Sequence, residues 1–215
     1  VHSPTYVGFT GVLKTNDMDI VSSPLVQDEN GVYRMDFADM EKKIQEKGIR
    51  VAIFCNPHNP TGRVWTKEEI SDYIDLMAKY GITVISDEIW ADFMIGEGKK
   101  HIPTQSVSED AKQRTVALYA PSKTFNLAGF QASNIIIPNE EYRRKMPGSG
   151  GYFSLNFLSY KACEIVYNQC EDWLDELLEV IDGNRKTVEE FMKEHLPGVK
   201  VYRMQGTYLQ WLDFS

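Results

Sequence analysis

The chain has 215 residues and a formal net charge of -8, and its 42% hydrophobic and 25% charged residues are typical of a soluble globular protein rather than a disordered one. The excess of 31 acidic over 23 basic residues argues against a nucleic-acid partner, because phosphate binding requires a basic surface. No apolar run approaches the roughly 20 residues that span a bilayer and no signal peptide is visible, so we expect no membrane partner.

Cysteine and histidine usage indicates a reducing compartment and no metal centre. The three cysteines, Cys55, Cys163 and Cys170, form an odd set without CxxC spacing, which fits reduced thiols in the cytoplasm better than disulfides. The histidines are scattered, so a metal site is not expected. The chain begins at Val1 without methionine and stops after a strand-like stretch at Ser215, which indicates a fragment of a longer protein.

The first predicted elements alternate between helix and strand. Residues 36–47 form a helix with Asp36 as its N-cap and a glycine at its end, and the apolar run 51–54 predicts a buried strand. A second helix begins at Thr66, whose spacing to Glu69 is that of a capping box. This alternation is typical of an α/β protein.

Further strands follow at 83–86, 115–119 and 134–137, and together they predict a mostly parallel sheet with helices on both faces. Beyond Pro147 the pattern changes to helices, at 155–166, 174–181 and 184–194, and then to strands at 199–202 and 207–212. We therefore expect a large-domain portion at 1–150, linking helices at 151–195 and the start of a small α+β domain at 196–215. The glycine cluster at 148–151 is interpreted as a hinge rather than a phosphate cradle.

Polar residues follow three successive strands. The segment 56–62 comes after the first, Asp87-Glu88 after the second and Ser122-Lys123 after the third. Ligands of parallel α/β sheets bind at the carboxyl ends of the strands. The sequence therefore predicts that an amide, a carboxylate and an amine meet at one edge, where they could hold a polar aromatic cofactor.

Three motifs, at 55–63 (CNPHNPTGR), 86–89 (SDEI) and 120–129 (APSKTFNLAG), resemble the class I/II aminotransferase family. Their order and spacing are similar to those of the family, and the third motif resembles most the cystathionine β-lyase (cysteine-S-conjugate β-lyase) branch. The resemblance implies the fold-type-I architecture and the cofactor pyridoxal 5'-phosphate.

The resemblance also implies roles for individual residues. Lys123 matches the lysine that bonds covalently to the cofactor and later moves the Cα proton. Asp87 matches the carboxylate that pairs with the pyridine nitrogen, and Asn59 matches the amide that donates to the ring's phenolate oxygen. Purely structural roles, as a surface lysine, a strand-end cap and a turn asparagine, are the alternatives.

Three more residues complete the expected site. Tyr6 matches the aromatic side chain that stacks on the pyridine ring, and Ser122 matches a phosphate-binding hydroxyl. Trp90 stands where many members carry a tyrosine that reaches the phenolate, and an indole offers one donor with a different reach. Structural roles are again open for Tyr6, as a core tyrosine, and for Ser122, as a cap. His58 is interpreted as structural, and Glu88 as half of a local ion pair.

Two further departures weaken the expected phosphate contacts, because Gln131 stands where many members have arginine and Ala120 where many have a hydroxyl. They favour the lyase branch, and the resemblance to that branch implies β-elimination from an S-substituted cysteine such as cystathionine, which yields pyruvate, ammonia and a thiol. An aminotransferase is the first alternative and a non-catalytic regulatory module the second. The family implies an amino-acid substrate and a homodimer. We expect the chain alone to be a poor enzyme, because the family's upstream phosphate turn and carboxylate-binding arginine are not in it.

Overall fold

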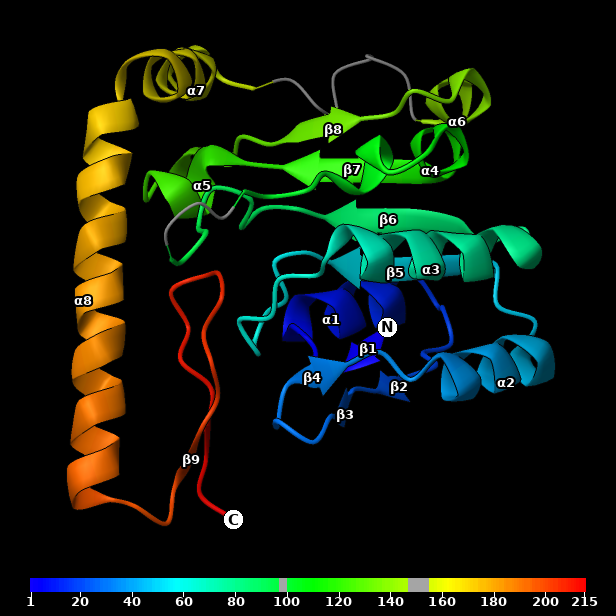
Figure 1. Ribbon diagram of the computed structural model, residues 1–215. Coiled ribbons are helices and arrows are strands. Elements are labelled where there is room, and N and C mark those ends of the chain that lie inside the picture. The colour runs from blue at the N-terminus through cyan, green and yellow to red at the C-terminus, as the bar shows by residue number, and fades with distance from the viewer. Residues whose placement is uncertain (97–99, 147–154) are drawn as a thin grey trace.

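The computed structural model describes residues 1–96, 100–146 and 155–215 (Figure 1). Its centre is a four-stranded sheet of β5 (Val51–Cys55), β6 (Thr83–Asp87), β7 (Thr115–Tyr119) and β8 (Asn134–Ile136), in that order. The first three strands run parallel, and β8 pairs antiparallel with β7. The mostly parallel α/β sheet predicted from the sequence is thereby confirmed.

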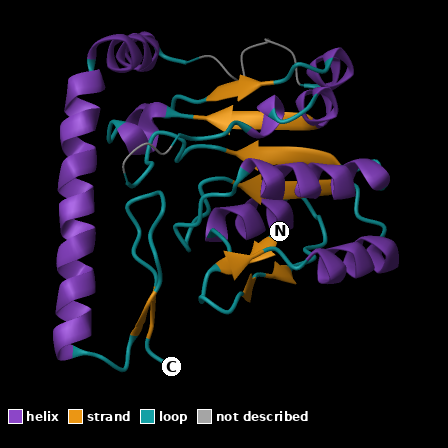
Figure 2. Cartoon of the chain, in the orientation of Figure 1, coloured by secondary structure: helices purple, strands orange, loops and turns teal. Residues whose placement is uncertain are grey.

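The other elements surround this sheet (Figure 2). They are the strands β1 (His2–Ser3), β2 (Ser23–Pro24), β3 (Val26–Gln27), β4 (Tyr33–Arg34), β9 (Lys200–Val201) and β10 (Leu212–Asp213), the α-helices α1 (Val7–Thr15), α2 (Phe37–Lys47), α3 (Lys67–Lys79), α4 (Glu109–Arg114), α5 (Pro121–Thr124), α6 (Glu140–Lys145), α7 (Phe157–Gln169) and α8 (Glu171–His195), and the 3-10 turns η1 (Thr104–Ser106) and η2 (Ala128–Phe130).

Local capping signals determine where α2 and α3 begin and end. The Asp36 side chain accepts a hydrogen bond from the Asp39 N–H, and Gly48 adopts the left-handed conformation that ends α2. Thr66 and Glu69 form the expected capping box of α3. These helices bury one apolar stripe each, which anchors them against one face of the sheet.

The main core lies between α3 and the sheet. Phe54 of β5 stacks on Tyr73 of α3 with ring centroids 4.5 Å apart, so even-numbered positions of β5 face this helix. Val51 is 38% exposed, so β5 is less buried than the sequence predicted. Residues of α1, β5 and α3, among them Leu13, Ile53 and Tyr73, line a cavity of about 300 Å³.

The long helix α8 corrects one sequence-based expectation. Two helices were expected at 174–181 and 184–194, whereas α8 is one continuous helix of 25 residues that contains Gly183. Its apolar residues, including Leu177 and Ile181, pack in a second core with Trp90, Phe93 and Met204. Burial of this face compensates for the weak helix propensity of glycine.

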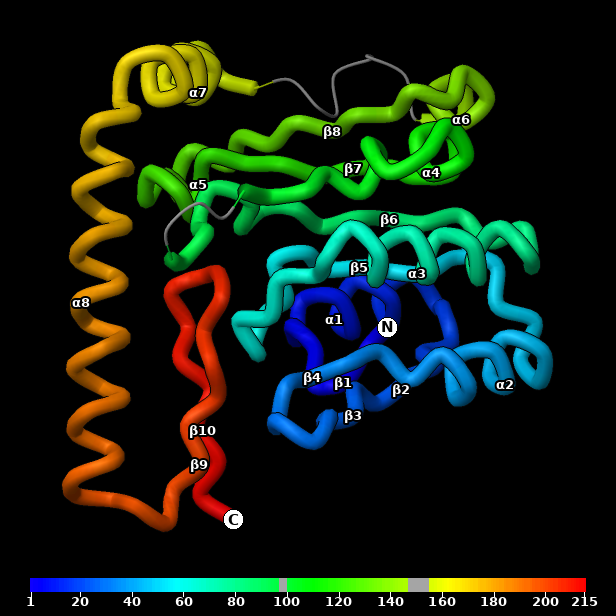
Figure 3. The backbone as a smooth tube through the Cα atoms, in the orientation of Figure 1, coloured from blue at the N-terminus to red at the C-terminus, as the bar shows by residue number. Residues whose placement is uncertain are grey.

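The C-terminal segment forms an antiparallel pair, β9 with β10, beside α8 (Figure 3). These strands are shorter than the stretches 199–202 and 207–212 expected from the sequence. Tyr202 stacks on Tyr33 of β4 with centroids 4.9 Å apart, so the two ends of the chain are packed together.

The glycine cluster at 148–151 lies outside the described residues. Within the described part, none of the helices combines the length and apolar character needed to span a bilayer.

Candidate active site

The carboxyl ends of β5, β6 and β7 meet at one edge of the sheet. Cys55 pairs in register with Asp87, and Asp87 with Leu118. The backbone N–H of Asn56 donates to the Asp87 carbonyl at 3.0 Å, and that of Glu88 to the Leu118 carbonyl at 2.9 Å. The segments predicted to carry the chemistry therefore leave the sheet side by side.

Hydrogen bonds rigidify the turn after β5. Asn56 is fully buried and its side-chain oxygen accepts from the Trp65 N–H at 3.3 Å, while His58 Nδ1 lies 2.8 Å from Thr61 Oγ1. Asn59 is half-buried at the tip of this turn. The side-chain amide of Asn59 makes no hydrogen bond with the described residues, so it could donate to a ligand. His58 is buried in the turn, in keeping with a structural role.

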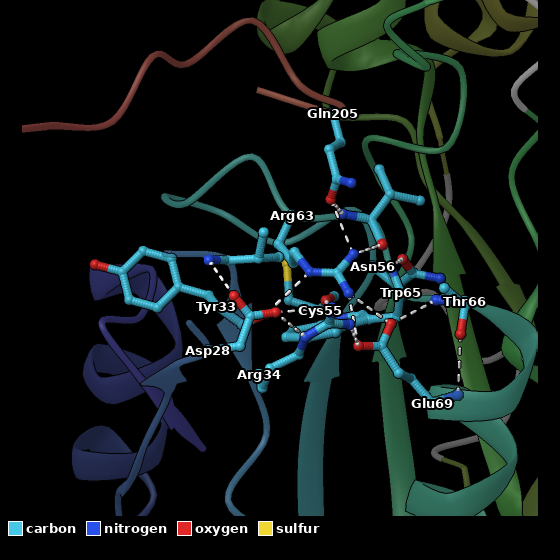
Figure 4. Close-up of polar contacts among 12 residues, drawn as sticks. Asp28, Tyr33, Arg34, Cys55, Asn56, Arg63, Trp65, Thr66, Glu69 and Gln205 are labelled. Atoms are coloured by element: carbon cyan, nitrogen blue, oxygen red, sulfur yellow. Dashed lines mark hydrogen bonds and ion pairs between the residues drawn. The ribbon is translucent and has the colours of Figure 1, made fainter. Parts of the chain in front are cut away.

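Arg63 follows the turn and links it to several distant residues through its guanidinium (Figure 4). Its guanidinium donates to both Glu69 oxygens at 2.6 and 2.7 Å, to the Tyr33 carbonyl at 3.0 Å and to Gln205 Oε1 at 2.9 Å. Arg34 contacts the same Glu69 carboxylate at 2.7 Å. The turn that presents Asn59 is therefore tied to α3, to β4 and to the C-terminal segment.

Asp87 ends β6 and is half-buried. Its Oδ1 accepts the Ile89 N–H at 3.1 Å. Burial raises the pKa of this carboxyl above its usual range and Glu88 adds to the rise, whereas the Ile89 hydrogen bond and the positive charge of Lys123 oppose it. A cationic or strongly donating ligand group at Asp87 would therefore be stabilised by a carboxylate that is short of positive partners.

Lys123 approaches Asp87 from α5. Its Nζ lies 5.7 Å from the centroid of the Trp90 ring, within cation–π range. Trp90 is buried, and Tyr208 packs edge-to-face against it with centroids 4.6 Å apart. An amine, a carboxylate and an indole thus share one space, and the C-terminal segment covers the indole.

Tyr6 and Ser122 are less closely connected to the other site residues. Tyr6 is the N-cap residue of α1, is 46% exposed and packs edge-to-face on Phe9 at 5.5 Å. Ser122 is half-buried in α5, where its carbonyl accepts the Leu127 N–H at 3.0 Å. Among the described residues, neither the Tyr6 nor the Ser122 side chain forms a hydrogen bond or ring contact with Asp87 or Lys123.

Sequence reasoning missed a buried network beside Asp87. Glu88 is 1% exposed, and its carboxylate contacts Ser86 Oγ at 2.9 Å, the Thr104 N–H at 3.2 Å, His101 Nε2 at 2.5 Å and the Tyr119 hydroxyl at 2.6 Å. The sequence predicted a local ion pair for Glu88, whereas its carboxylate is held by four contacts, three of them from residues 13 to 31 positions away. The only feature of the sequence that points to this network is that Glu88 adjoins Asp87. The partners of Glu88 could not be identified, because most of them come from distant segments.

The site combines the amine of Lys123, the Asp87 carboxylate, which favours a cationic neighbour, and the side-chain amide of Asn59. Such a set can hold a polar ring and move a proton beside it. Gln131, at the position expected for a phosphate-binding arginine in the family, is exposed and donates to the Ala128 carbonyl at 2.9 Å. Among the described residues there is no group of three or more His, Cys, Asp or Glu side chains that could hold a metal ion.

Known proteins resemble this chain along its whole length. The sequence profile described as "Aminotransferase class I and II" matches residues 1–215. Cystathionine beta-lyase PatB of Bacillus subtilis (strain 168) is 41% identical over 218 residues, which cover 100% of this chain and 56% of that protein.

Two solved structures share the fold. Cystalysin from Treponema denticola, whose structure contains a pyridoxal 5'-phosphate cofactor, superposes with a TM-score of 0.93 at 38% identity, over 99% of this chain and 54% of that one. The PLP-bound C-S lyase from Staphylococcus hominis superposes with a TM-score of 0.93 at 34% identity, over 99% of this chain and 53% of that one. The chain therefore spans about half the length of the relatives it matches.

Proposed function

The chain belongs to the aminotransferase class I and II family, and on that premise we propose that it is the cofactor-binding part of a pyridoxal-phosphate-dependent carbon–sulfur β-lyase. Its substrate would be cystathionine or another S-substituted cysteine, and its products pyruvate, ammonia and a thiol. One observation carries the proposal: Asp87 and Lys123 face the same space at the carboxyl ends of adjacent parallel strands. The similarity to a cystathionine beta-lyase and to a C-S lyase supports the choice of reaction.

The residues present fit pyridoxal phosphate. The raised pKa of Asp87 indicates a carboxylate that a protonated pyridine nitrogen would stabilise. Lys123 Nζ lies at the face of the Trp90 ring and could bond to the aldehyde carbon, and the free amide of Asn59 could donate to the phenolate oxygen. We propose Tyr6 as the stacking ring and Ser122 as a phosphate contact.

When bound, pyridoxal phosphate supplies an electrophilic carbon for the substrate amine and a ring that stabilises negative charge on Cα. The Asp87 carboxylate would hold the proton on the ring nitrogen and so keep the ring able to accept negative charge. Lys123 Nζ, released as the neutral amine when the substrate amine replaces it on the aldehyde carbon, would take the Cα proton, and the thiolate would leave from Cβ. Water would then convert the remaining three-carbon fragment to pyruvate and ammonia. The buried Trp90 ring, against which Tyr208 packs, lies on one side of Lys123.

Two experiments test the proposal on the full-length protein. Borohydride treatment in the presence of pyridoxal phosphate should fix the cofactor to the peptide that contains Lys123. With cystathionine, pyruvate should form faster than glutamate forms from 2-oxoglutarate and an amino-acid donor. Labelling of another lysine would overturn the site, and faster glutamate formation would make the protein an aminotransferase.

We propose that the whole protein is a homodimer in the cytoplasm, with residues 1–150 as a large-domain portion, 151–195 as linking helices and 196–215 as the start of a small domain. We also propose that the 215 residues alone turn over poorly, because the similar lyases are about twice as long. Turnover of the isolated chain equal to that of the longer protein would contradict this last proposal.

A further inference from the structure

The short helix α5, which carries Lys123, has little structure of its own to hold it. It has four residues, and the backbone bonds that close it are those from Phe125 to Pro121 at 2.9 Å, from Leu127 to Ser122 at 3.0 Å and from Asn126 to Lys123 at 3.4 Å. The position of the Lys123 amine must therefore depend on the side chains that anchor the helix at its two ends.

One anchor precedes the helix. Tyr119, the last residue of β7, donates its hydroxyl to Glu88 Oε2 at 2.6 Å. Burial and the neighbouring carboxylate raise the pKa of Tyr119, so its hydroxyl keeps the proton that it donates. Ser86, His101 and Thr104 hold the same carboxylate. Since Glu88 is buried in this network, it is a fixed point for the start of α5.

A second anchor lies at the other end. Thr124, the last residue of α5, is fully buried and donates its hydroxyl to Asp92 Oδ2 at 2.7 Å. The residue next to Lys123 is thus held by a hydrogen bond to a carboxylate, which is stronger than a bond between neutral groups.

Both carboxylates come from the same stretch of chain. Glu88 directly follows Asp87, and Asp92 lies four residues further on, with Trp90 between them. Two hydrogen bonds thus join this stretch to β7 and α5, one on each side of Lys123. Together with the packing of α5 against η2 and α7, these two hydrogen bonds restrict where the helix that carries Lys123 can lie relative to this stretch.

We propose that Tyr119 and Thr124 are positioning residues that set the Lys123 amine relative to Asp87 and to the cofactor ring. This inference rests on the proposed function. Neither residue acts on the substrate; each acts through Glu88 or Asp92. A displacement of about 1 Å in a reacting group can lower the rate by about 10²-fold, so loss of either anchor should affect the chemical step more than substrate binding.

The experiment compares Tyr119→Phe, Thr124→Val and the double variant in the full-length holoenzyme. The matched control is Tyr142→Phe, which removes a tyrosine hydroxyl that lies 2.9 Å from Thr83 Oγ1 at the opposite end of β6. The readouts are kcat and KM for cystathionine, the dissociation constant of pyridoxal phosphate, and the pH midpoint of the visible absorbance of the bound cofactor.

We expect each anchor variant to lower kcat at least about 10-fold with KM changed less than about 3-fold, and to shift the absorbance midpoint by at least about half a pH unit. The control should leave all readouts unchanged. Thr124→Ser, which keeps the hydroxyl, should restore wild-type values.

The inference is overturned if the anchor variants match Tyr142→Phe, or if they lower only the melting temperature while kcat and the absorbance midpoint stay unchanged. If Thr124→Val does not fold, Tyr119→Phe decides the question by the same criteria. Failure of the proposed function gives a different result, because the wild-type protein would then either not be labelled at Lys123 by borohydride or form glutamate faster than pyruvate.

Discussion

The guanidinium of Arg63 donates to both carboxylate oxygens of Glu69, at 2.6 and 2.7 Å, and both side chains are largely withdrawn from solvent. Glu69 also closes the capping box of α3, where its Oε2 accepts the Thr66 N–H at 2.8 Å. One carboxylate therefore joins the turn that presents Asn59 to the start of a core helix, as Figure 4 shows for the labelled residues.

Removal of Glu69 should be strongly destabilising, because Arg63 would remain buried with an unpaired charge. We expect Glu69→Ala to lower the free energy of unfolding by about 3–5 kcal/mol. The control is Glu141→Ala, whose pair with Lys145 is exposed on α6 and screened by solvent, so that we expect this variant to change stability little. Urea denaturation at pH 7 measures both, and equal losses would refute the buried-pair argument.

Two buried histidines should make the fold acid-sensitive. His2 and His58 lie with ring centroids 6.5 Å apart. Burial, with the neighbouring His58, lowers the pKa of His2 to about 3, and burial lowers that of His58 to about 4. Above about pH 6.5 the imidazoles of His2 and His58 are neutral in both the folded and the unfolded protein. Their effect on the free energy of unfolding therefore does not vary with pH in this range.

Below pH 6.5 the unfolded chain takes up protons that the folded chain excludes, so stability should fall until the pH reaches the folded pKa values near 4 and 3. At pH 5 the loss should be about 2 kcal/mol for each buried histidine. Urea titrations at pH 7 and pH 5 test this. His58→Gln should remove about half of the pH-dependent loss, and an unchanged loss in this variant would contradict the assignment to the buried histidines.

Asp87 should matter for rate more than for cofactor retention. We expect Asp87→Ala to keep pyridoxal phosphate bound but to lose at least ~10³-fold in turnover, the scale of one well-placed electrostatic group. Asp110→Ala, which removes the partner of Arg114 on α4, away from the carboxyl ends of the strands, is the control. A near-normal rate in Asp87→Ala would mean that this carboxylate is structural.

The parts of the fold that the sequence predicts well are determined by neighbouring residues. The caps at Asp36 and Thr66 act within one helical turn, and the strand ends at Asp87 and Tyr119 follow from short apolar runs. Because parallel strands bring their carboxyl ends together, the meeting of Asp87 and Lys123 could also be predicted.

Long-range partners could not be predicted in this way. Glu88 contacts His101 and Tyr119, which are 13 and 31 residues away, and Arg63 contacts Gln205, 142 residues away. No local pattern selects one such partner among many polar residues, because the choice depends on how the elements pack. The roles proposed for Tyr6 and Ser122 still depend on the family resemblance.

Two glycines should respond to alanine in opposite ways. Gly183 lies inside α8, and a Cβ there would meet nothing within 4 Å. Gly183→Ala should therefore stabilise the protein by about 0.5–1 kcal/mol, because alanine has the higher helix propensity and restricts the unfolded chain. Gly62 has φ of +66°, and a Cβ there would lie 3.2 Å from both the Gly206 carbonyl oxygen and Met204 Cγ.

Gly62→Ala should be destabilising by about 1–3 kcal/mol, since it adds left-handed strain and pushes the C-terminal segment away from the turn. The carbonyl of Gly62 accepts the N–H groups of Gln205 and Gly206 at 2.9 and 3.0 Å, so these contacts would be displaced as well. Urea midpoints of the two variants at pH 7 should move in opposite directions. If Gly183→Ala lowers the midpoint, α8 is interrupted at that glycine, as the sequence alone suggested, and the continuous helix is wrong.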